Sequence, residues 1–402
     1  MRLYGTEEAN RAAALAALEA YAPAAGNYGA TRNWETGPRG RRTTSRLSPF
    51  LRHRLLLEPE VVDAVTAAHG QSAVRKFVQE VYWRTYFKGW LQMRPAVWRD
   101  YRNAVRAASR EVDGDSALRR RWREAVGGRT GIACFDHWSR ELRDTGYLHN
   151  HARMWFASIW IFTLRLPWVL GAAFFLRHLL DGDAASNTLS WRWVGGLHTR
   201  GKIYVARASN IEQFTGGRFA PHGELNERPE ALRESVVYER RPVEPMPETP
   251  PADGRAFVLC LTDDDCLPER SALADARIVG VAGLWADGCP DGADYSEPVR
   301  EFKRAAVRDA VGRASGKFGC AGELFALDAN TSGPPPGLAE WCARRGADAV
   351  VLARPPVGVN ADALAGGNGP ELPVFRVDRP WDAAHWPLAT AGYFNFRKKL
   401  GL

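Results

Sequence analysis

The sequence lacks several features that define whole classes of protein. Its six cysteines include no C-x-x-C pair and show no zinc or iron–sulfur spacing, so we expect no metal site. Free thiols then predict a reducing, cytoplasmic environment, and the N-terminus shows no secretory pattern. The most apolar window, 154–180, is interrupted by Arg165, Pro167 and Arg177. These interruptions predict buried core helices and no membrane span.

Alternation of apolar and polar residues at strand spacing is nearly absent before residue 200. Helical spacing dominates instead and predicts a mainly α domain over residues 1–220. Ser48-Pro49 indicates a helix start, with Ser48 as the cap and Pro49 at the first position. Residues 26–42 are predicted to form a loop. The other predicted helices cover residues 2–19, 58–68, 72–93, 117–125, 132–146, 152–164 and 169–180.

Five prolines between residues 242 and 251 predict a stiff linker, placed at 221–253. Beyond it, short apolar runs alternate with helical patterns, which predicts a C-terminal α/β, Rossmann-like domain over 254–402 with a parallel sheet. The basic and aromatic end, 393–402, is expected to pack back on the body of the protein. The predicted strands are 256–261, 278–282, 323–327, 349–352 and 374–377, with helices at 298–314 and 336–345.

Positive charge is concentrated in the first part of the chain. Residues 1–240 carry 36 Lys and Arg against 24 Asp and Glu, whereas the remainder carries 18 against 22. A basic domain suits a polyanion such as DNA, because neutralising phosphates releases counterions. The alternative explanation is an Arg-rich composition without a polyanion partner.

Four short motifs in the helical part carry the candidate site. In Thr44-Ser45-Arg46-Leu47-Ser48-Pro49, hydroxyls and free amides at a helix start suit a phosphate. In the second motif, residues 80–87, Glu80 and Trp83 are three residues apart and share a helix face. There an indole could stack on a planar base while the carboxylate accepts its N–H groups, although an aromatic core helix is the alternative. The remaining motifs are residues 145–154 and 181–193.

Taken in order, these motifs resemble the flavin domain of the cryptochrome/photolyase family over about residues 5–217. The resemblance implies FAD as the cofactor. It places the isoalloxazine ring between Arg153 and Asp181, which could stabilise an anionic reduced flavin. Thr188 stands where photolyases usually have Asn facing flavin N5. The other cofactor-binding residues that the resemblance implies are Tyr28, Thr44, Ser45, Leu47, Ser48, Asp183 and Asn187.

The resemblance also implies light-driven repair of DNA by electron transfer to a flipped-out lesion. Asn150 stands where (6-4) photolyases have the second His of a pair, which favours cyclobutane pyrimidine dimers, although the adjacent His151 keeps (6-4) repair open. The implied lesion pocket consists of Glu80, Trp83, Asn150, Met154 and Trp193. The implied photoreduction chain begins with Trp191 and Trp168. Further candidates for its exit are Trp122, Trp138, Trp155 and Trp160.

The chain departs from the family pattern in the placement of its α/β part. The family's antenna domain precedes the flavin domain, whereas here an α/β segment follows it. We expect either a relocated antenna-like domain, with its chromophore unidentified, or an unrelated accessory domain. The resemblance implies a monomeric deoxyribodipyrimidine photolyase acting on UV-damaged DNA without a membrane. A cryptochrome-like blue-light photoreceptor or a (6-4) photolyase is the alternative.

Overall fold

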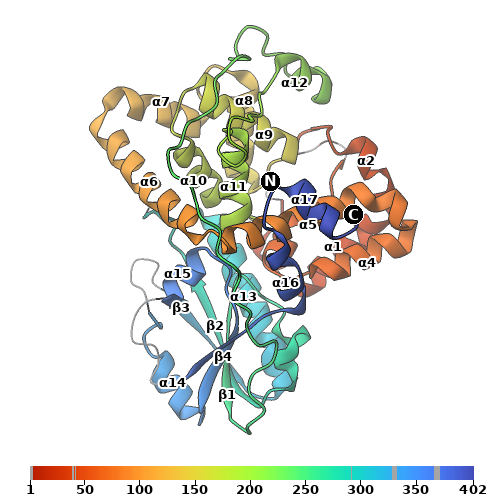
Figure 1. Ribbon diagram of the computed structural model, residues 1–402, viewed down its shortest axis with the longest axis vertical. Coiled ribbons are helices and arrows are strands. Elements are labelled where there is room, and N and C mark those ends of the chain that lie inside the picture. The colour runs from red at the N-terminus through yellow and green to blue at the C-terminus, as the bar shows by residue number, and fades with distance from the viewer. Residues whose placement is uncertain (1–2, 39, 41, 291, 328–332, 366–371) are drawn as a thin grey trace.

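The computed structural model describes residues 3–38, 40, 42–290, 292–327, 333–365 and 372–402. A helical part and a parallel-sheet part lie in direct contact, with the sheet below the helices in Figure 1. Within these ranges no disulfide joins the cysteines, and no cluster of His, Cys, Asp and Glu could hold a metal ion. The same ranges include no helix long and apolar enough to span a bilayer.

The described residues up to Phe214 form a mainly α part, as the sequence predicts for the start of the chain. Buried indoles fill its centre, and Trp98, Trp138 and Trp155 are each at most 2% exposed. A π-helix, Ile159–Thr163, continues from α9. The helices are α1 (Arg11–Tyr21), α2 (Tyr28–Thr31), α3 (Ser48–Arg52), α4 (Glu58–His69), α5 (Gln71–Gln92), α6 (Pro95–Gly114), α7 (Ser116–Gly127), α8 (Ala133–Thr145), α9 (Asn150–Ser158), α10 (Trp168–His178), α11 (Ala184–Val194) and α12 (Ala208–Phe214).

Two local predictions are wrong. The expected loop at residues 26–42 contains α2, preceded by the 3-10 helix Ala22–Asn27. Ser48 is the first residue of α3 and does not cap it; the N-cap is Leu47, which has no polar side chain to accept a hydrogen bond. The Ser48 hydroxyl instead lies against the Asp181 carboxylate and helps to lower its pKa.

The segment from 215 to 256 forms neither helix nor strand and follows the surface of the helical part. The Leu232 amide donates to the Gly195 carbonyl at 3.0 Å, and the Arg241 amide to the Met93 carbonyl at 2.9 Å. Glu234 accepts two hydrogen bonds from Arg192, at 2.9 and 2.6 Å. The segment therefore lies along the helices as an ordered strap (Figure 1), and we propose that the domain boundary falls within it.

All five predicted strands are confirmed, and they form one parallel sheet of order β3-β2-β1-β4-β5. The strand order reverses between β1 and β4, the point where doubly wound sheets usually bind ligands at their carboxyl ends. Helix α13 packs on the face of the sheet that adjoins the helical part, so one apolar core spans both parts. The elements are β1 (Phe257–Thr262), β2 (Ile278–Ala286), α13 (Glu297–Phe318), β3 (Ala321–Leu327), α14 (Leu338–Arg344), β4 (Ala349–Ala353), α15 (Val359–Ala365) and β5 (Val374–Val377).

After β5 the chain returns to the helical part, as the sequence predicts for its end. Helices α16 (Pro380–His385) and α17 (Tyr393–Lys399) pack against α5 (Figure 1). A Cβ atom on Gly89 of α5 would lie 2.7 Å from the Trp386 Cα, so only glycine permits this close approach. Trp386 is 1% exposed. The last residues therefore complete the surface of the helical part.

Candidate functional site

An ion pair between the half-buried Arg153 and the buried Asp181 lies at the centre of the candidate site. Arg153 is in the first turn of α9, and Asp181 precedes α11; their Nη2 and Oδ2 atoms are 3.0 Å apart. Burial would raise the pKa of Asp181, but the Arg153 and Arg84 guanidiniums outweigh it and the pKa is lowered. Among the described residues, Asp181 Oδ1 has no hydrogen-bond partner. An ionised carboxylate with one open oxygen suits an N–H donor of a bound ring.

The other three predicted cofactor-binding residues of this motif, Asp183, Asn187 and Thr188, differ in whether their polar atoms have hydrogen-bond partners within the protein. Thr188 is fully buried, and its Oγ1 has no partner among the described residues. The Asn187 side-chain amide donates to the Ala172 carbonyl at 2.7 Å. Asp183 caps α11 with one oxygen and accepts from Arg84 Nη1 at 2.8 Å with the other. Thr188 therefore presents an open polar atom in the same motif as Asp181, whereas both Asp183 oxygens are used within the protein.

The predicted phosphate segment lies against the third motif. Thr44 Oγ1 and the Tyr147 hydroxyl are 3.0 Å apart, and the Tyr147 ring packs under the Arg153 guanidinium at 5.4 Å. Ser45 Oγ accepts from the Leu47 amide at 3.3 Å, and the Leu47 side chain is fully buried. The structure thus brings the first motif to the Arg153–Asp181 pair in two ways, through Tyr147 and through the Ser48 hydroxyl beside Asp181.

Tyr28, the other predicted cofactor contact, lies against α5. Its ring meets the edge of Phe77 at a centroid distance of 5.3 Å. Burial and the nearby Glu80 carboxylate raise the pKa of the Tyr28 hydroxyl. Tyr28 therefore lies near the second motif, and among the described residues the hydroxyls of Thr44 and Ser45 bond to Tyr147 and Leu47 and not to Tyr28.

The two predicted lesion-binding residues of α5 each have a partner from the chain itself. Glu80 forms an ion pair with Arg32. Burial raises the pKa of Glu80, although Arg32 opposes the shift. The Trp83 ring is stacked on Tyr393 of α17, with centroids 3.6 Å apart and planes at 13°. One face of Trp83 is thus covered by the C-terminal helix.

The other three predicted lesion residues differ in exposure, and two of them adjoin residues that line a cleft. Asn150 is exposed, Met154 is half-buried, and Trp193 stacks on Tyr204 with centroids 5.6 Å apart. Tyr204 lines a cleft of about 330 Å³, together with His151, which follows Asn150 in the chain. The remaining lining residues are Asn33, Val205, Arg207, Asn210 and Phe214.

The predicted electron-transfer tryptophans lie in different aromatic clusters. Trp191 is 2% exposed and meets Trp160 edge-on at a centroid distance of 6.2 Å. Trp168 instead contacts Tyr101 at 5.7 Å, and Tyr101 contacts Trp98 at 5.4 Å. No ring contact joins Trp168 directly to Trp191 among the described residues. The packing therefore favours Trp160, one of the alternative candidates, as the neighbour of Trp191.

Three further residues of the site were not predicted: Tyr147, Arg84 and His149. Burial, and then the positive neighbours His151 and Arg153, lower the pKa of His149 to about 3. Its Nδ1 accepts from the His151 amide at 3.1 Å, so the neutral ring carries its proton on Nε2. That buried Nε2 has no partner among the described residues. Each of the three lies inside a motif, which is the signal that could have identified it.

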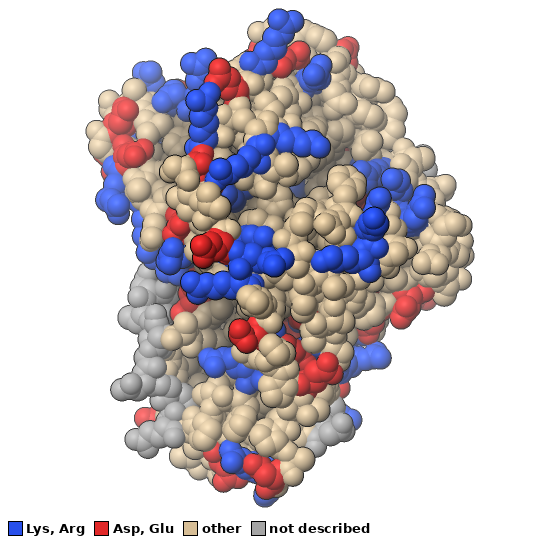
Figure 2. All heavy atoms as spheres, in the orientation of Figure 1, with Lys and Arg blue, Asp and Glu red and all other residues tan. Residues whose placement is uncertain are grey.

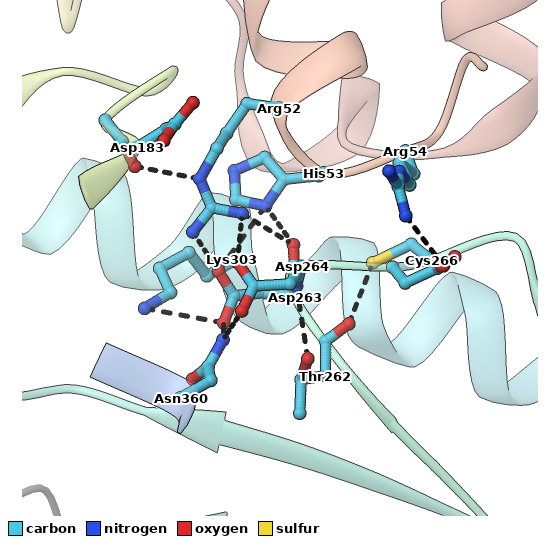
Figure 3. A network of polar contacts seen from close by, with 12 residues as sticks. Arg52, His53, Arg54, Asp183, Thr262, Asp263, Asp264, Cys266, Lys303 and Asn360 are labelled. Atoms are coloured by element: carbon cyan, nitrogen blue, oxygen red, sulfur yellow. Dashed lines mark hydrogen bonds and ion pairs between the residues drawn. The ribbon is translucent and has the colours of Figure 1, made fainter. Parts of the chain in front are cut away.

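A buried polar network connects this site to the carboxyl edge of the sheet (Figure 3). Arg52 of α3 donates to the Gly182 carbonyl at 2.8 Å and pairs with Asp263 and Asp264, which follow β1, at 3.1 and 2.8 Å. Asn360 of α15 donates to both carboxylates, at 2.8 and 2.9 Å. The switch point of the sheet is therefore occupied by side chains of both parts.

This network leaves little room where a doubly wound sheet would usually bind a ligand. The cavity beside Arg52, Asp264 and the 356–358 loop measures about 20 Å³. That volume is enough for roughly one water molecule. An antenna chromophore therefore does not fit at this point of the structure, and the antenna-like nature of the α/β part stays a proposal.

Comparison with known proteins identifies the helical part. Residues 77–227 match the family model for the FAD binding domain of DNA photolyase. A deoxyribodipyrimidine photo-lyase of Thermus thermophilus is 34% identical over 223 residues, which are 54% of this chain and 48% of that protein. The Streptomyces griseus deoxyribodipyrimidine photo-lyase is 37% identical over 157 residues, 39% of this chain and 33% of that protein. The chain thus spans half or less of the length of these relatives.

Among solved structures, the cryptochrome of Synechocystis sp. PCC6803 is similar to this chain at 23% sequence identity and a TM-score of 0.45. The alignment covers 53% of this chain and 45% of the cryptochrome. Residues 77–227 are therefore similar to the FAD-binding domain of DNA photolyase, in the part of the chain where the motifs predict a flavin domain.

Proposed function

We propose that the protein is a FAD-dependent photolyase that repairs cyclobutane pyrimidine dimers in DNA. The Arg153–Asp181 pair carries this proposal, because Asp181 Oδ1 and Thr188 Oγ1 are buried and open among the described residues. These atoms fit the polar edge of an isoalloxazine ring. Thr44, Ser45 and Tyr147 would lie toward the phosphates. Bound FAD would supply light absorption and one-electron transfer to the lesion.

The chain's own residues would position the lesion and the DNA. Asn150, exposed at the start of α9, would donate to a flipped-out dimer, and Trp193 beside Tyr204 of the cleft would offer a stacking surface. Glu80 would accept N–H groups of the bases. The excess of Lys and Arg in residues 1–240 supports binding to the phosphate backbone without reading of the sequence. We propose that the protein acts on UV-damaged DNA as a monomer.

Light-dependent loss of dimers tests the proposal. The full chain is purified and its FAD is identified by absorbance. A dimer-containing oligonucleotide is then incubated with the protein in light and in darkness, and the remaining dimers are measured. Asn150→Ala should slow repair about tenfold or more while FAD stays bound, since it removes a hydrogen bond to the lesion. Asn103→Ala, at an exposed position of α6, is the matched control and should repair normally. A protein that binds no flavin, or repairs nothing in light, refutes the proposal.

A cryptochrome-like photoreceptor is the second candidate function. The stacking of Tyr393 on Trp83 favours it, because that face of the indole is closed to a substrate base. Thr188, in the place of the usual Asn, also fits a flavin with altered proton chemistry. Under this second candidate, light should change the flavin spectrum of the protein reversibly, and dimers should persist.

A further inference from the structure

Helix α17 has one face on α5 and another in solvent. Tyr393 and Phe396, three residues apart, are 5% and 1% exposed and pack on the aromatic side chains of α5. The Tyr393 hydroxyl donates to the Gln79 carbonyl at 2.5 Å. Phe394 points the other way and is 71% exposed. The buried pair therefore fixes the helix and presents Phe394 to solvent on the element that covers Trp83.

The exposed face of α17 is also basic. Arg397 is half-buried, and Lys398 and Lys399 are exposed. None of these three side chains forms an ion pair with an acidic side chain among the described residues; Lys399 donates to the Leu388 carbonyl and to Thr390 Oγ1. Figure 2 shows Lys and Arg side chains gathered on this face, over the region where Figure 1 places α2, α5 and α17. The surroundings of Phe394 therefore suit a polyanion.

We propose that α17 is a second DNA-contacting element, with Phe394 as a wedge and with Arg397 and Lys398 on the phosphates. A flipped-out dimer leaves a gap in the base stack, and an exposed aromatic side chain can fill such a gap. The position is appropriate, because Tyr393 lies on Trp83 and close enough to Glu80 for that carboxylate to raise its pKa. The inference rests on the proposed function. Residues 393–399 lie outside the segment that matches the family model.

Equilibrium binding to two labelled duplexes tests the wedge. One duplex carries a single thymine dimer and the other is its undamaged copy; both are titrated in darkness with the full-length, flavin-bound protein. Phe394→Ala should weaken binding to the dimer duplex about tenfold or more, because it removes a stacking contact, and should change binding to the undamaged duplex less than about twofold. Val374→Ala, at an apolar position 38% exposed on the edge strand β5, is the matched control.

The phosphate contacts are tested through the salt dependence of binding. Lys398→Gln should weaken binding to both duplexes equally and reduce the slope of log K against log salt by about one. Lys317→Gln, at the exposed end of α13, should leave both quantities unchanged. A Lys398→Gln variant with an unchanged slope contradicts the assignment of this side chain.

The outcomes separate this inference from the proposed function. If the unmodified protein prefers the dimer duplex and Phe394→Ala keeps the full preference, the wedge is overturned and photolyase function stands. Tighter binding by Phe394→Ala also overturns it, because α17 would then act as a cover over Trp83. If the unmodified protein shows neither a preference for dimers nor repair in light, both proposals fail. Unchanged thermal unfolding and FAD content of each variant exclude a folding defect as the cause.

Discussion

Replacing Gly171 by alanine should destabilise the protein and displace the indole of Trp191. Gly171 lies in α10, where an added Cβ would be 2.3 Å from Trp191 Cη2 and 2.9 Å from Trp160 Cε2. Carbon atoms in favourable contact are about 3.5–4.0 Å apart, so at least one indole must move. Both indoles are at most 2% exposed, so the surrounding side chains leave little space for the movement.

The expected change in the free energy of unfolding is obtained by comparison with a second helical glycine, Gly312. Gly312 of α13 has open space around its Cβ position, so Gly312→Ala should stabilise the protein by about 1 kcal/mol through helix propensity. Gly171→Ala has the same propensity gain but also an overpacking cost of about 1–3 kcal/mol. The difference in free energy of unfolding between the two variants therefore isolates the overpacking, and we expect it to be about 3 kcal/mol because two indoles are affected.

Urea denaturation of both flavin-bound variants measures this difference, provided that the slope with denaturant stays constant. In the same variants, the rate of light-driven flavin reduction by an added thiol reports on the path through Trp191 and Trp160. Gly171→Ala should slow it, and Gly312→Ala should not. Equal stability of the two variants would refute the packing argument. A normal reduction rate in a destabilised Gly171→Ala protein would remove Trp191 from the path.

Three further predictions concern charged and titrating groups. Arg54→Met leaves the buried Asp382 without its cation, whereas Asp265 keeps Arg379, and it should cost about 3–5 kcal/mol in urea unfolding; a loss under about 1 kcal/mol would contradict this. Burial, then Arg192, lowers the pKa of His198 to about 4, so between about pH 6.5 and 4 the unfolded state binds more protons. His198 alone should therefore contribute a loss of about 2 kcal/mol between about pH 7 and 5, and His198→Gln should reduce the slope of stability against pH by that share; equal slopes would exclude His198. Asp181→Asn should weaken FAD binding about tenfold or more in a fluorescence titration, whereas Asp183→Asn should mainly lower stability. An equal loss of FAD affinity in both variants would contradict the different roles given to the two carboxylates.

Much of the fold was predictable because burial leaves a simple pattern. All six residues of β1 are buried, and such continuous apolar runs between turn residues mark central parallel strands. Helix α6 was missed although Val97, Tyr101, Val105, Ala108 and Val112 recur at helical spacing on its buried face. The charged residues between them lower the mean hydropathy of the segment and conceal the apolar stripe. Only the periodicity, and not the overall composition, identifies this helix.

The site was predictable as a set of motifs but not as an arrangement of open and occupied atoms. Asp181 and Asp183 look equivalent in the sequence, yet among the described residues one keeps an open oxygen and the other caps a helix. That difference depends on which arginine and which amide groups lie near by in space. Tyr393 is 310 residues from Trp83. No local pattern could predict that stacking contact, because it is made by the return of the chain after β5.

The return of α16 and α17 to α5 has a consequence for dividing the protein into fragments. A cut within residues 242–251 would break the covalent link but leave the noncovalent contacts of the last helices in place. The N-terminal fragment alone would expose the groove at Gly89 and the rings of Tyr82 and Tyr86, an apolar surface that favours aggregation. Co-produced fragments should therefore assemble into a soluble heterodimer, while the first fragment by itself should precipitate.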